Sequence, residues 1–524
     1  MGIPSYYKRL IDQYPRLVSK GGALAGFRSD VLLMDFNCLI YQCVRAKGMP
    51  AYSADVEQRE AWEAALIEAV KKYTVGVWEK AGKPREVFLA VDGVVPMAKI
   101  RQQRQRRFKS LWWAAAEREA GVREGETWDT NAITPGTAFM EALGRGLGQL
   151  CKARGWQLSA ADEAGEGEQK VMAWIRRGGR GEGAALAGKR VVVYGLDADL
   201  IVLSLLSLTG GGGAVASWHL LRELAEFEGG REVAEGAFGA LDVRELLGLL
   251  VPSGLSAAEY MLEYVCAMSF LGNDFLPHSL SITMREGGHD EMCRTLTAVH
   301  SEQGRLVDAA TGKVRAAGCA AFLRRWAEKE EEWLERTVGH KYKGRGPPPR
   351  NDKERAMLPV QNLPLEWKEE ECIWSREGGL RAGWRETYRR RWLRGAAVER
   401  ACSVYIEGLQ WILDYYLGKP VSYSWYYPWN VPPLWPDLVA ALSGGGAVAA
   451  PPVSAPVAPQ EQLAMVLPMG SWWLVRDAKL RGLPTRAPVY WPAGFGFFSA
   501  GKRWMWECEA EVPILCVERL RGLV

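Results

Sequence analysis

The sequence has little histidine, no paired cysteines, no long apolar run and almost no net charge. It holds only five His in 524 residues, and none of its ten Cys forms a CxxC pair or lies near a His at zinc-site spacing. Scattered Cys in a long chain are typical of a reduced protein of the cytoplasm or nucleus. Because no apolar stretch reaches about 18 residues and the N-terminus lacks a signal core, we expect a protein that is neither secreted nor membrane-spanning.

The charge and the apolar fraction exclude two further classes of protein. Lys and Arg number 66 against 62 Asp and Glu, so the net charge of +4 excludes a polybasic, histone-like binder. An acidic disordered chain is excluded because 48% of the residues are apolar and 24% are charged. The residue in excess is tryptophan, with 23 Trp against 13 Phe. Trp packs well and also stacks on bases, and we expect most of these rings to pack.

Three short apolar runs in the N-terminal part of the chain each lead to a carboxylate. These are residues 31–34 before Asp35, 87–91 before Asp92, and 191–194 before Asp197 and Asp199. Runs of this length suit strands buried on both faces, as in a parallel sheet. Helical patterns over 60–78 and 138–153 lie between them. The alternation predicts an α/β fold with a doubly wound, mostly parallel sheet.

The remaining sequence predicts a division into two regions. We expect an N-terminal α/β domain over 1–340, a linker over 341–382, and a mostly helical, Trp-rich region over 383–524 packed against it. Smaller expected features are a charged helix over 321–337, a flexible loop over 210–213 and a Gly/Ala/Pro-rich connector over 443–459.

Seven carboxylates form the sharpest set of candidate functional residues. They are Asp35, Asp92, Glu166, Glu168, Asp197, Asp199 and Asp274. Each alone is typical of a turn or a helix cap, but gathered at one end of a sheet they would repel one another unless cations held them. Oxygen ligands without His or Cys favour Mg²⁺ or Mn²⁺. Two such ions stabilise the attacking and leaving oxygens of a phosphodiester, so the set indicates metal-dependent phosphoryl transfer.

A long basic helix is predicted directly after Asp92. No Gly or Pro interrupts the helical pattern from Pro96 to about Gly121. At 3.6 residues per turn, four polar side chains share one face of it: Lys99, Gln103, Arg106 and Arg107. Three cations and an amide suit a terminal phosphate, although a solvated basic face is the alternative. The position beside the acids favours the phosphate site.

Motifs along most of the chain resemble those of the XRN-type 5′-to-3′ exoribonucleases. They follow the family's order over residues 1–4, 33–37, 90–94, 102–108, 133–137, 165–170, 194–200, 272–278, 285–287, 383–388, 405–413, 424–428 and 461–468. The region between 286 and 383 matches poorly, and 470–524 cannot be aligned. The resemblance implies a PIN/5′-nuclease-like fold in a compact member that covers the catalytic core.

The resemblance also implies an activity and the residues that carry it. It implies a processive, Mg²⁺-dependent enzyme, with one or two ions, that degrades single-stranded RNA with a 5′-monophosphate to mononucleotides in RNA decay. The seven acids correspond to the family's metal-binding active site, and Lys99, Gln103, Arg106 and Arg107 to its 5′-phosphate pocket. The family clamps the first bases between two aromatic rings. These correspond to Tyr41, where the family has His, and to Trp425, with Tyr423 as the second choice. We expect a monomer without a membrane partner.

Two other functions stay open from the sequence alone. A structure-specific 5′ nuclease acting on DNA, of the flap endonuclease kind, shares clustered acids at strand ends. A catalytically silent RNA-binding scaffold is the second alternative. The motif Gln102–Phe108 and the C-terminal aromatic segment favour the exoribonuclease over the DNA enzyme. The intact acid set argues against a silent protein.

Overall fold

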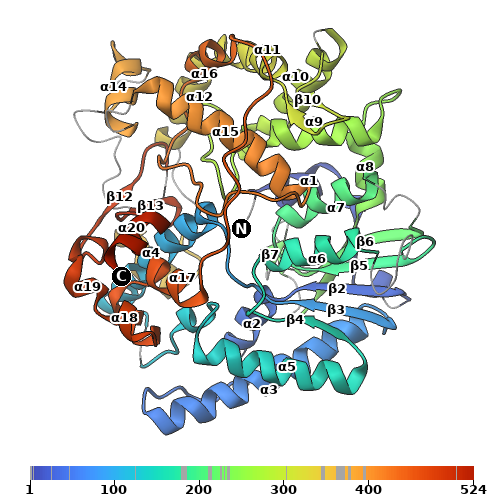
Figure 1. Ribbon diagram of the computed structural model, residues 1–524, viewed down its shortest axis with the longest axis vertical. Helices are drawn as coiled ribbons and strands as arrows, with labels where there is room; N and C mark the ends of the chain where they lie inside the picture. The colour runs from blue at the N-terminus through green and yellow to red at the C-terminus, as the bar shows by residue number, and fades with distance from the viewer. Residues whose placement is uncertain are drawn as a thin grey trace.

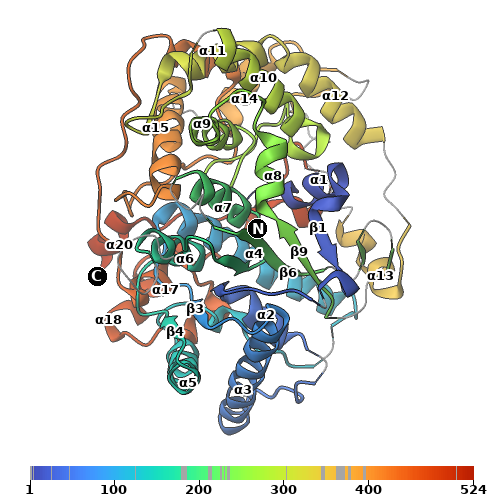
Figure 2. The ribbon, with the colours of Figure 1, turned by 90° about the vertical axis from the view of Figure 1, so that its right-hand side faces the viewer.

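The computed structural model places one mixed sheet at the centre of the N-terminal region (Figures 1 and 2). Its order is β1-β9-β6-β5-β2-β3-β4, with bounds β1 Val18–Lys20, β2 Val31–Asp35, β3 Glu86–Ala90, β4 Gln157–Ser159, β5 Arg190–Tyr194, β6 Ser217–Glu223 and β9 Phe238–Asp242. Strands β6, β5, β2, β3 and β4 are parallel, and β9 pairs antiparallel with β6 and β1. The predicted mostly parallel sheet is therefore confirmed.

The structure describes most of the chain but not all of it. The exceptions are residues 1–2, 4, 25, 47, 124, 179–185, 211–214, 225–226, 229–230, 233–235, 303, 344–347, 362–371, 376–378, 394–396 and 503. Residues 1–2 and 4 of the N-terminal motif, 211–213 of the predicted loop and much of the predicted linker thus lie outside the described residues.

Helices cover both faces of the sheet, which explains why its central strands are apolar throughout. Alternate residues of β2 enter different cores: Val31 and Leu33 pack on one side, Leu32 and Met34 on the other. One face carries α2 Asn37–Val44, α3 Val56–Lys80 and α5 Ala138–Arg154; the other carries α6 Gly167–Arg176, α7 Asp199–Thr209, α8 Val243–Leu250 and α9 Ala257–Ser269. The helices predicted over 60–78 and 138–153 are thereby confirmed as α3 and α5.

The helix predicted over 321–337 is wrong in one respect, because two helices form there. Helix α11 spans Ala316–Ala327, and α12 begins at Glu330 and runs to Lys343. The break turns Glu330 inward, where it is 3% exposed and accepts a hydrogen bond of 3.2 Å from the backbone N–H of Trp435. Trp435 begins α16 Trp435–Leu442, so a buried carboxyl group caps a helix from the C-terminal region.

The C-terminal region is mostly helical, as predicted, and it shares cores with the N-terminal one. Its elements are α14 Trp384–Trp392, α15 Val398–Tyr416, α16, α17 Pro459–Val466, α18 Ala478–Arg481, α19 Leu483–Arg486, β12 Gly496–Phe498, β13 Glu509–Glu511 and α20 Val517–Leu523. The other elements are α1 Tyr6–Gln13, β7 Phe227–Glu228, β8 Arg231–Glu232, α10 Gly288–Glu302, β10 Val307–Asp308, β11 Lys313–Val314 and α13 Asp352–Gln361. Helix α13 falls within the segment predicted as a linker. The predicted boundaries at 340 and 383 stay predictions.

Helix α4, Met97–Glu119, is the axis around which the last part of the chain wraps (Figure 1). This helix confirms the long helix predicted to begin at Pro96. Arg104 on α4 is fully buried and donates to the backbone carbonyls of Met465, Tyr490 and Pro513. Burial lowers the pKa of Arg104 to about 9. One cation of the basic helix therefore fastens the C-terminal segment instead of meeting a ligand.

Two further expectations can be compared with the described residues. All ten Cys are free thiols, and most described Trp side chains are at least partly buried, with Trp473 and Trp506 exposed by 48% and 45%. No helix among the described residues combines the length and apolar character needed to cross a membrane.

Candidate functional site

The parallel sheet brings the seven predicted carboxylates together at the carboxyl ends of its strands. Asp35 ends β2, Asp92 follows β3, Glu166 and Glu168 begin α6, Asp197 and Asp199 join β5 to α7, and Asp274 follows α9. Because β5, β2 and β3 are adjacent and parallel, their carboxyl ends lie side by side. The charges of Asp92, Asp197 and Glu166 all act on Asp35, which shows that acids far apart in sequence meet here.

Small residues let the backbone reach these acids. A Cβ on Gly167 would collide with the Asp35 carboxylate and with the carbonyl oxygen of Ala90. The absence of that Cβ lets the N–H of Gly167 donate to Oδ1 of Asp92 at 2.7 Å. Gly167 is thus required by the close packing of α6 on the ends of β2 and β3, whereas Gly165 has a φ of +112°, in the region that favours glycine.

Burial makes the ionised forms of Asp199 and Glu168 unfavourable. Burial raises the pKa of Asp199 well above its ordinary value, and the charges of Asp197 and Asp274 raise it further. Burial also raises the pKa of Glu168, with Glu166 as the next cause. Both oxygens of Asp199 and Oε1 of Glu168 are buried and have no hydrogen-bond partner among the described residues. Buried, unpartnered oxygens of this kind fit a cation that neutralises them.

The donor set therefore fits a hard divalent cation, although the described residues contain no ready-made coordination cluster. Among the described residues, no three acidic, His or Cys side chains are already arranged to hold a metal ion. The set is nevertheless purely carboxylate, which is the ligand type of Mg²⁺ and Mn²⁺. Glu166, Glu168 and Asp199 are buried and the other four acids are partly buried. The metal assignment of the seven acids stays a prediction that this burial supports.

Lys99 lies among the acids rather than beside them. Its Nζ is 2.6 Å from Glu166 and 2.7 Å from Asp274. Burial alone would lower the pKa of Lys99, but Asp274 and then Glu166 outweigh it and raise the pKa well above its ordinary value. Lys99 therefore stays charged and offsets part of the negative charge of the cluster. Its predicted place in a phosphate pocket stays a prediction.

The other three residues of the predicted phosphate face differ in exposure. Arg107 is 6% exposed, and its Nη1 donates to Oδ1 of Asn131 at 2.7 Å. Its Nε is buried without an acceptor among the described residues, and burial lowers the pKa of Arg107 to about 10. Gln103 is buried, whereas Arg106 is exposed and forms no ion pair in the described part of the chain. Unpaired guanidinium groups beside a buried amide suit a bound phosphate.

The aromatic residues predicted to clamp bases differ in how exposed their rings are. Trp425 is 8% exposed and stacks on Trp411, with ring centroids 5.1 Å apart. A packing role accounts for this ring, so Trp425 is the weaker of the two choices. Tyr423 and Tyr41 are each only partly buried. The base-stacking role stays a prediction, and exposure favours Tyr41 with Tyr423.

Three residues that support the site were not singled out from the sequence. Tyr415 on α15 donates to Oε2 of Glu166 at 2.7 Å, and Gln102 donates to Oδ1 of Asp274 at 2.7 Å. Asn131 holds Arg107 and itself donates to Ser471 Oγ at 2.8 Å. Gln102 stands inside the motif at 102–108, whereas Tyr415 lies 249 positions from its partner. No local pattern identifies a contact of that separation.

Comparison with known proteins gives matches at both ends of the chain. The model of the XRN 5′-3′ exonuclease N-terminus matches residues 1–211, and that of the Xrn1 helical domain matches residues 380–522. Human 5′-3′ exoribonuclease 1 is 29% identical over 99% of this chain and 34% of its own length. Arabidopsis thaliana 5′-3′ exoribonuclease 2 is 25% identical over 99% of this chain and 66% of its own length.

The chain thus spans about one third to two thirds of the length of these two relatives. Among solved structures, the catalytic core of Rad2 in complex with a DNA substrate matches 68% of this chain and 79% of that chain, with 14% identity and a TM-score of 0.33. That score is too low to carry an argument. The two family models cover six of the seven acids and most of the C-terminal region, while Asp274 lies between them; the matches to the two exoribonucleases extend over 99% of this chain. This chain belongs to the XRN family of 5′-3′ exonucleases.

Proposed function

We propose that the protein is a 5′-to-3′ exoribonuclease that degrades single-stranded RNA bearing a 5′-monophosphate to mononucleotides. The observation that carries the proposal is the gathering of seven carboxylates, three of them buried and four partly buried, beside a helix whose next turns present Gln103, Arg106 and Arg107. A reacting phosphodiester and a terminal phosphate, one nucleotide apart, need such a pair of neighbouring sites. We propose that the enzyme acts as a monomer in intracellular RNA decay.

The carboxylates would hold one or two divalent cations. Asp35, Asp92, Glu166, Glu168, Asp197, Asp199 and Asp274 are the residues proposed to bind them. Bound Mg²⁺ or Mn²⁺ supplies charge neutralisation and activation of water for phosphodiester hydrolysis. Without such ions, the buried acids hold protons or pair with Lys99, since their ionised forms repel one another.

Arg106 and Arg107 would seat the 5′-phosphate and so position the first phosphodiester. The buried guanidinium of Arg107 is fixed by Asn131, which leaves its Nε–H available for a phosphate oxygen. A fixed donor lowers the entropy lost when the substrate is aligned. Tyr41 and Tyr423 would stack the first bases, an interaction of about 1–3 kcal/mol per base that is independent of sequence.

Hydrolysis itself regenerates the recognised end. Water adds to phosphorus, the 3′-oxygen leaves with a proton as the hydroxyl of the released 5′-mononucleotide, and the phosphate stays on the shortened RNA. The new 5′-monophosphate is the group that fits the basic helix. Processive degradation follows because each turnover creates the next ligand of the same pocket.

A time course with Mg²⁺ on 5′-monophosphate and 5′-triphosphate RNA tests the proposal. We expect mononucleotides and undegraded RNA without a ladder of intermediates, and a strong preference for the monophosphate end. A ladder, or equal rates on both ends, would contradict it. In parallel, Asp197→Ala and Asp199→Ala should abolish cleavage but retain RNA binding, and mononucleotide release at the wild-type rate would refute the metal assignment.

Two controls separate the alternatives. Preferential cleavage of a DNA flap over phosphorylated RNA would identify a structure-specific DNA nuclease. RNA binding without hydrolysis, together with no thermal stabilisation by Mg²⁺, would identify a silent scaffold.

A further inference from the structure

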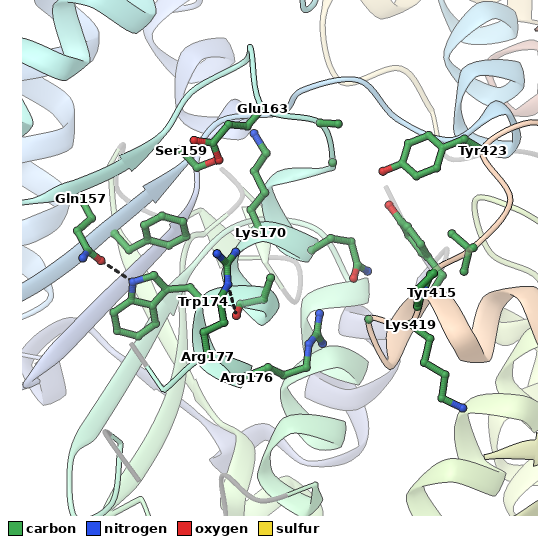
Figure 3. A pocket seen from close by; sticks show the side chains of 18 of the residues that line it. Gln157, Ser159, Glu163, Lys170, Trp174, Arg176, Arg177, Tyr415, Lys419 and Tyr423 are labelled. Atoms are coloured by element: carbon green, nitrogen blue, oxygen red, sulfur yellow. Dashed lines mark hydrogen bonds between the residues drawn. The ribbon is translucent and has the colours of Figure 1, made fainter. Parts of the chain in front are cut away.

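A cavity lies at the β4 edge of the sheet, and none of the seven acids lines it (Figure 3). It has a volume of about 740 Å³ and is lined by β4, α6, the end of α15 and the segment 418–423. Tyr415 forms part of its wall while its hydroxyl bonds Glu166. The cavity is therefore separate from the acids but in contact with a side chain that touches them. Its size falls in the range of ~300–1,000 Å³ typical of small-ligand sites.

The lining of this cavity is strongly cationic. Lys170, Arg176, Arg177 and Lys419 line it, against the single carboxylate of Glu163. Lys170 donates to two backbone carbonyls, and Lys419 lies 3.2 Å from Asp414. Arg176 and Arg177 form no ion pair within the described residues, so their charge is uncompensated there. An oxyanion is the ligand that two unpaired guanidinium groups recognise best.

A glycine leaves room for the side chain of Arg176. Its guanidinium lies against Gly418, and a Cβ at that position would collide with the guanidinium. Gly418 also has a φ of +70°, in the left-handed region that favours glycine. Figure 3 shows Arg176 and Arg177 side by side at the end of α6, across the cavity from Tyr415 and Tyr423. The local backbone thus leaves space for this one arginine.

The cavity also contains an unused donor and a flat ring. Gln169 is 9% exposed, and its Nε2 is buried without an acceptor among the described residues. Tyr423 lines the same space and is partly buried, whereas Trp174 is 7% exposed and packs on Phe88, with the two ring centroids 5.9 Å apart, as part of the cavity wall. A ligand that satisfies both features carries a phosphate and a planar base.

We propose that this cavity binds a 5′-mononucleotide, the product of the reaction, at a site distinct from the basic helix. The inference rests on the proposed function for the source of the nucleotide, although the binding itself does not require catalysis. Arg176 and Arg177 hold the phosphate, Gln169 donates to it or to the ribose, and the base contacts Tyr423, the ring that is also proposed to stack an RNA base. Because Tyr415 links the cavity wall to Glu166, occupancy affects the acid cluster and slows turnover as product accumulates.

The test measures AMP binding by equilibrium dialysis in EDTA, with Arg107→Ala as the background that weakens the helix pocket. AMP should bind this background at one site. Adding Arg176→Ala should weaken AMP binding at least tenfold, and Gly418→Ala should do the same by displacing Arg176. Arg176→Lys should retain part of the affinity. Lys152→Ala, an exposed cation that does not line the cavity, is the matched control and should change nothing.

Two further arms identify the ligand and separate the two proposals. Adenosine and inorganic phosphate should each bind more weakly than AMP; equal binding of phosphate would reduce the site to an anion site and overturn the nucleotide assignment. In RNA cleavage, Arg176→Ala should keep the initial rate and lose the noncompetitive part of AMP inhibition. No AMP binding in the Arg107→Ala background, with RNA cleavage intact in the wild type, overturns this inference alone. AMP binding at Arg176 without RNA cleavage overturns the proposed function alone.

Discussion

Replacing Asp199 with Asn removes a charge from the most deeply buried of the seven carboxylates and keeps its shape. Asp199 is 0% exposed, and neither of its oxygens has a partner among the described residues. Its pKa is raised well above the ordinary value, first by burial and then by Asp197 and Asp274. At neutral pH the metal-free protein must therefore protonate this group or tolerate the repulsion, and both lower its stability.

The expected magnitude follows from the burial of an unpartnered polar group. Such a group costs about 1–3 kcal/mol, and the Asn amide can donate to a neighbouring carboxylate. The Asp199→Asn protein should thus be more stable than the wild type in EDTA by about 1–3 kcal/mol. In Mg²⁺ the wild type gains about 2.7 kcal/mol when the ion is at 100 times its Kd. The variant should gain much less stability from Mg²⁺, so the difference in free energy of unfolding between the two proteins should shrink or change sign. RNA cleavage should be lost in the variant.

Urea unfolding in EDTA and in Mg²⁺, followed by circular dichroism, measures these differences. Asp162→Asn, an exposed acid near the same edge of the sheet, is the matched control and should change neither curve. The reasoning is refuted if Asp199→Asn is less stable than the wild type in EDTA. It is also refuted if both proteins gain equally from Mg²⁺.

Four other predictions follow from single contacts. Arg107→Ala should reduce the preference for 5′-monophosphate over 5′-hydroxyl RNA by about ten- to a hundredfold, because a charge-assisted bond is worth about 1.5–3 kcal/mol; equal preference in cleavage assays would contradict the pocket. Tyr415→Phe removes the 2.7 Å bond that lowers the pKa of Glu166, so the acid limb of the rate–pH profile should move to higher pH, and an unmoved limb would count against it. Trp425→Ala should lower the free energy of unfolding by about 3–5 kcal/mol because it leaves a cavity in the core, whereas Tyr423→Ala should mainly weaken RNA binding. Unfolding and filter-binding assays measure the two effects. The reverse pattern would identify Trp425 as the ring that stacks on the base. Burial raises the pKa of Glu330 to about 8, so the folded state keeps a proton that the unfolded chain loses above about pH 4.5. The free energy of unfolding should therefore fall as the pH rises from about 4.5 to about 8. Glu330→Gln should remove this pH dependence, as measured by urea unfolding at pH 5 and pH 8.

Local patterns predicted much of the scaffold. The apolar runs before Asp35, Asp92 and Asp197 became β2, β3 and β5, because buried parallel strands need apolar side chains on both faces. The uninterrupted pattern after Pro96 became α4. The helix predicted over 321–337 failed at one point, since periodicity does not record that Glu330 caps a distant helix.

The candidate site was predicted as a set of residues but not as a set of contacts. Lys99 and Arg107 share a helix face at the predicted spacing, yet Lys99 pairs with Glu166 and Asp274 whereas Arg107 meets Asn131. Arg104 is an arginine like its neighbours on α4, but it donates hydrogen bonds to three backbone carbonyls. Which cation faces the acids, which faces a ligand and which fastens the chain depends on the elements packed around α4.

By itself, the sequence determined the sheet, the long basic helix, the acids at the strand ends and the family. These are properties of spacing, since strand and helix periods fix which side chains share an edge or a face. Only the tertiary structure decided the packing role of Trp425, the link from Tyr415 to Glu166 and the cationic cavity around Arg176. Each depends on groups far apart in the chain meeting in the folded protein, and no local period encodes that proximity.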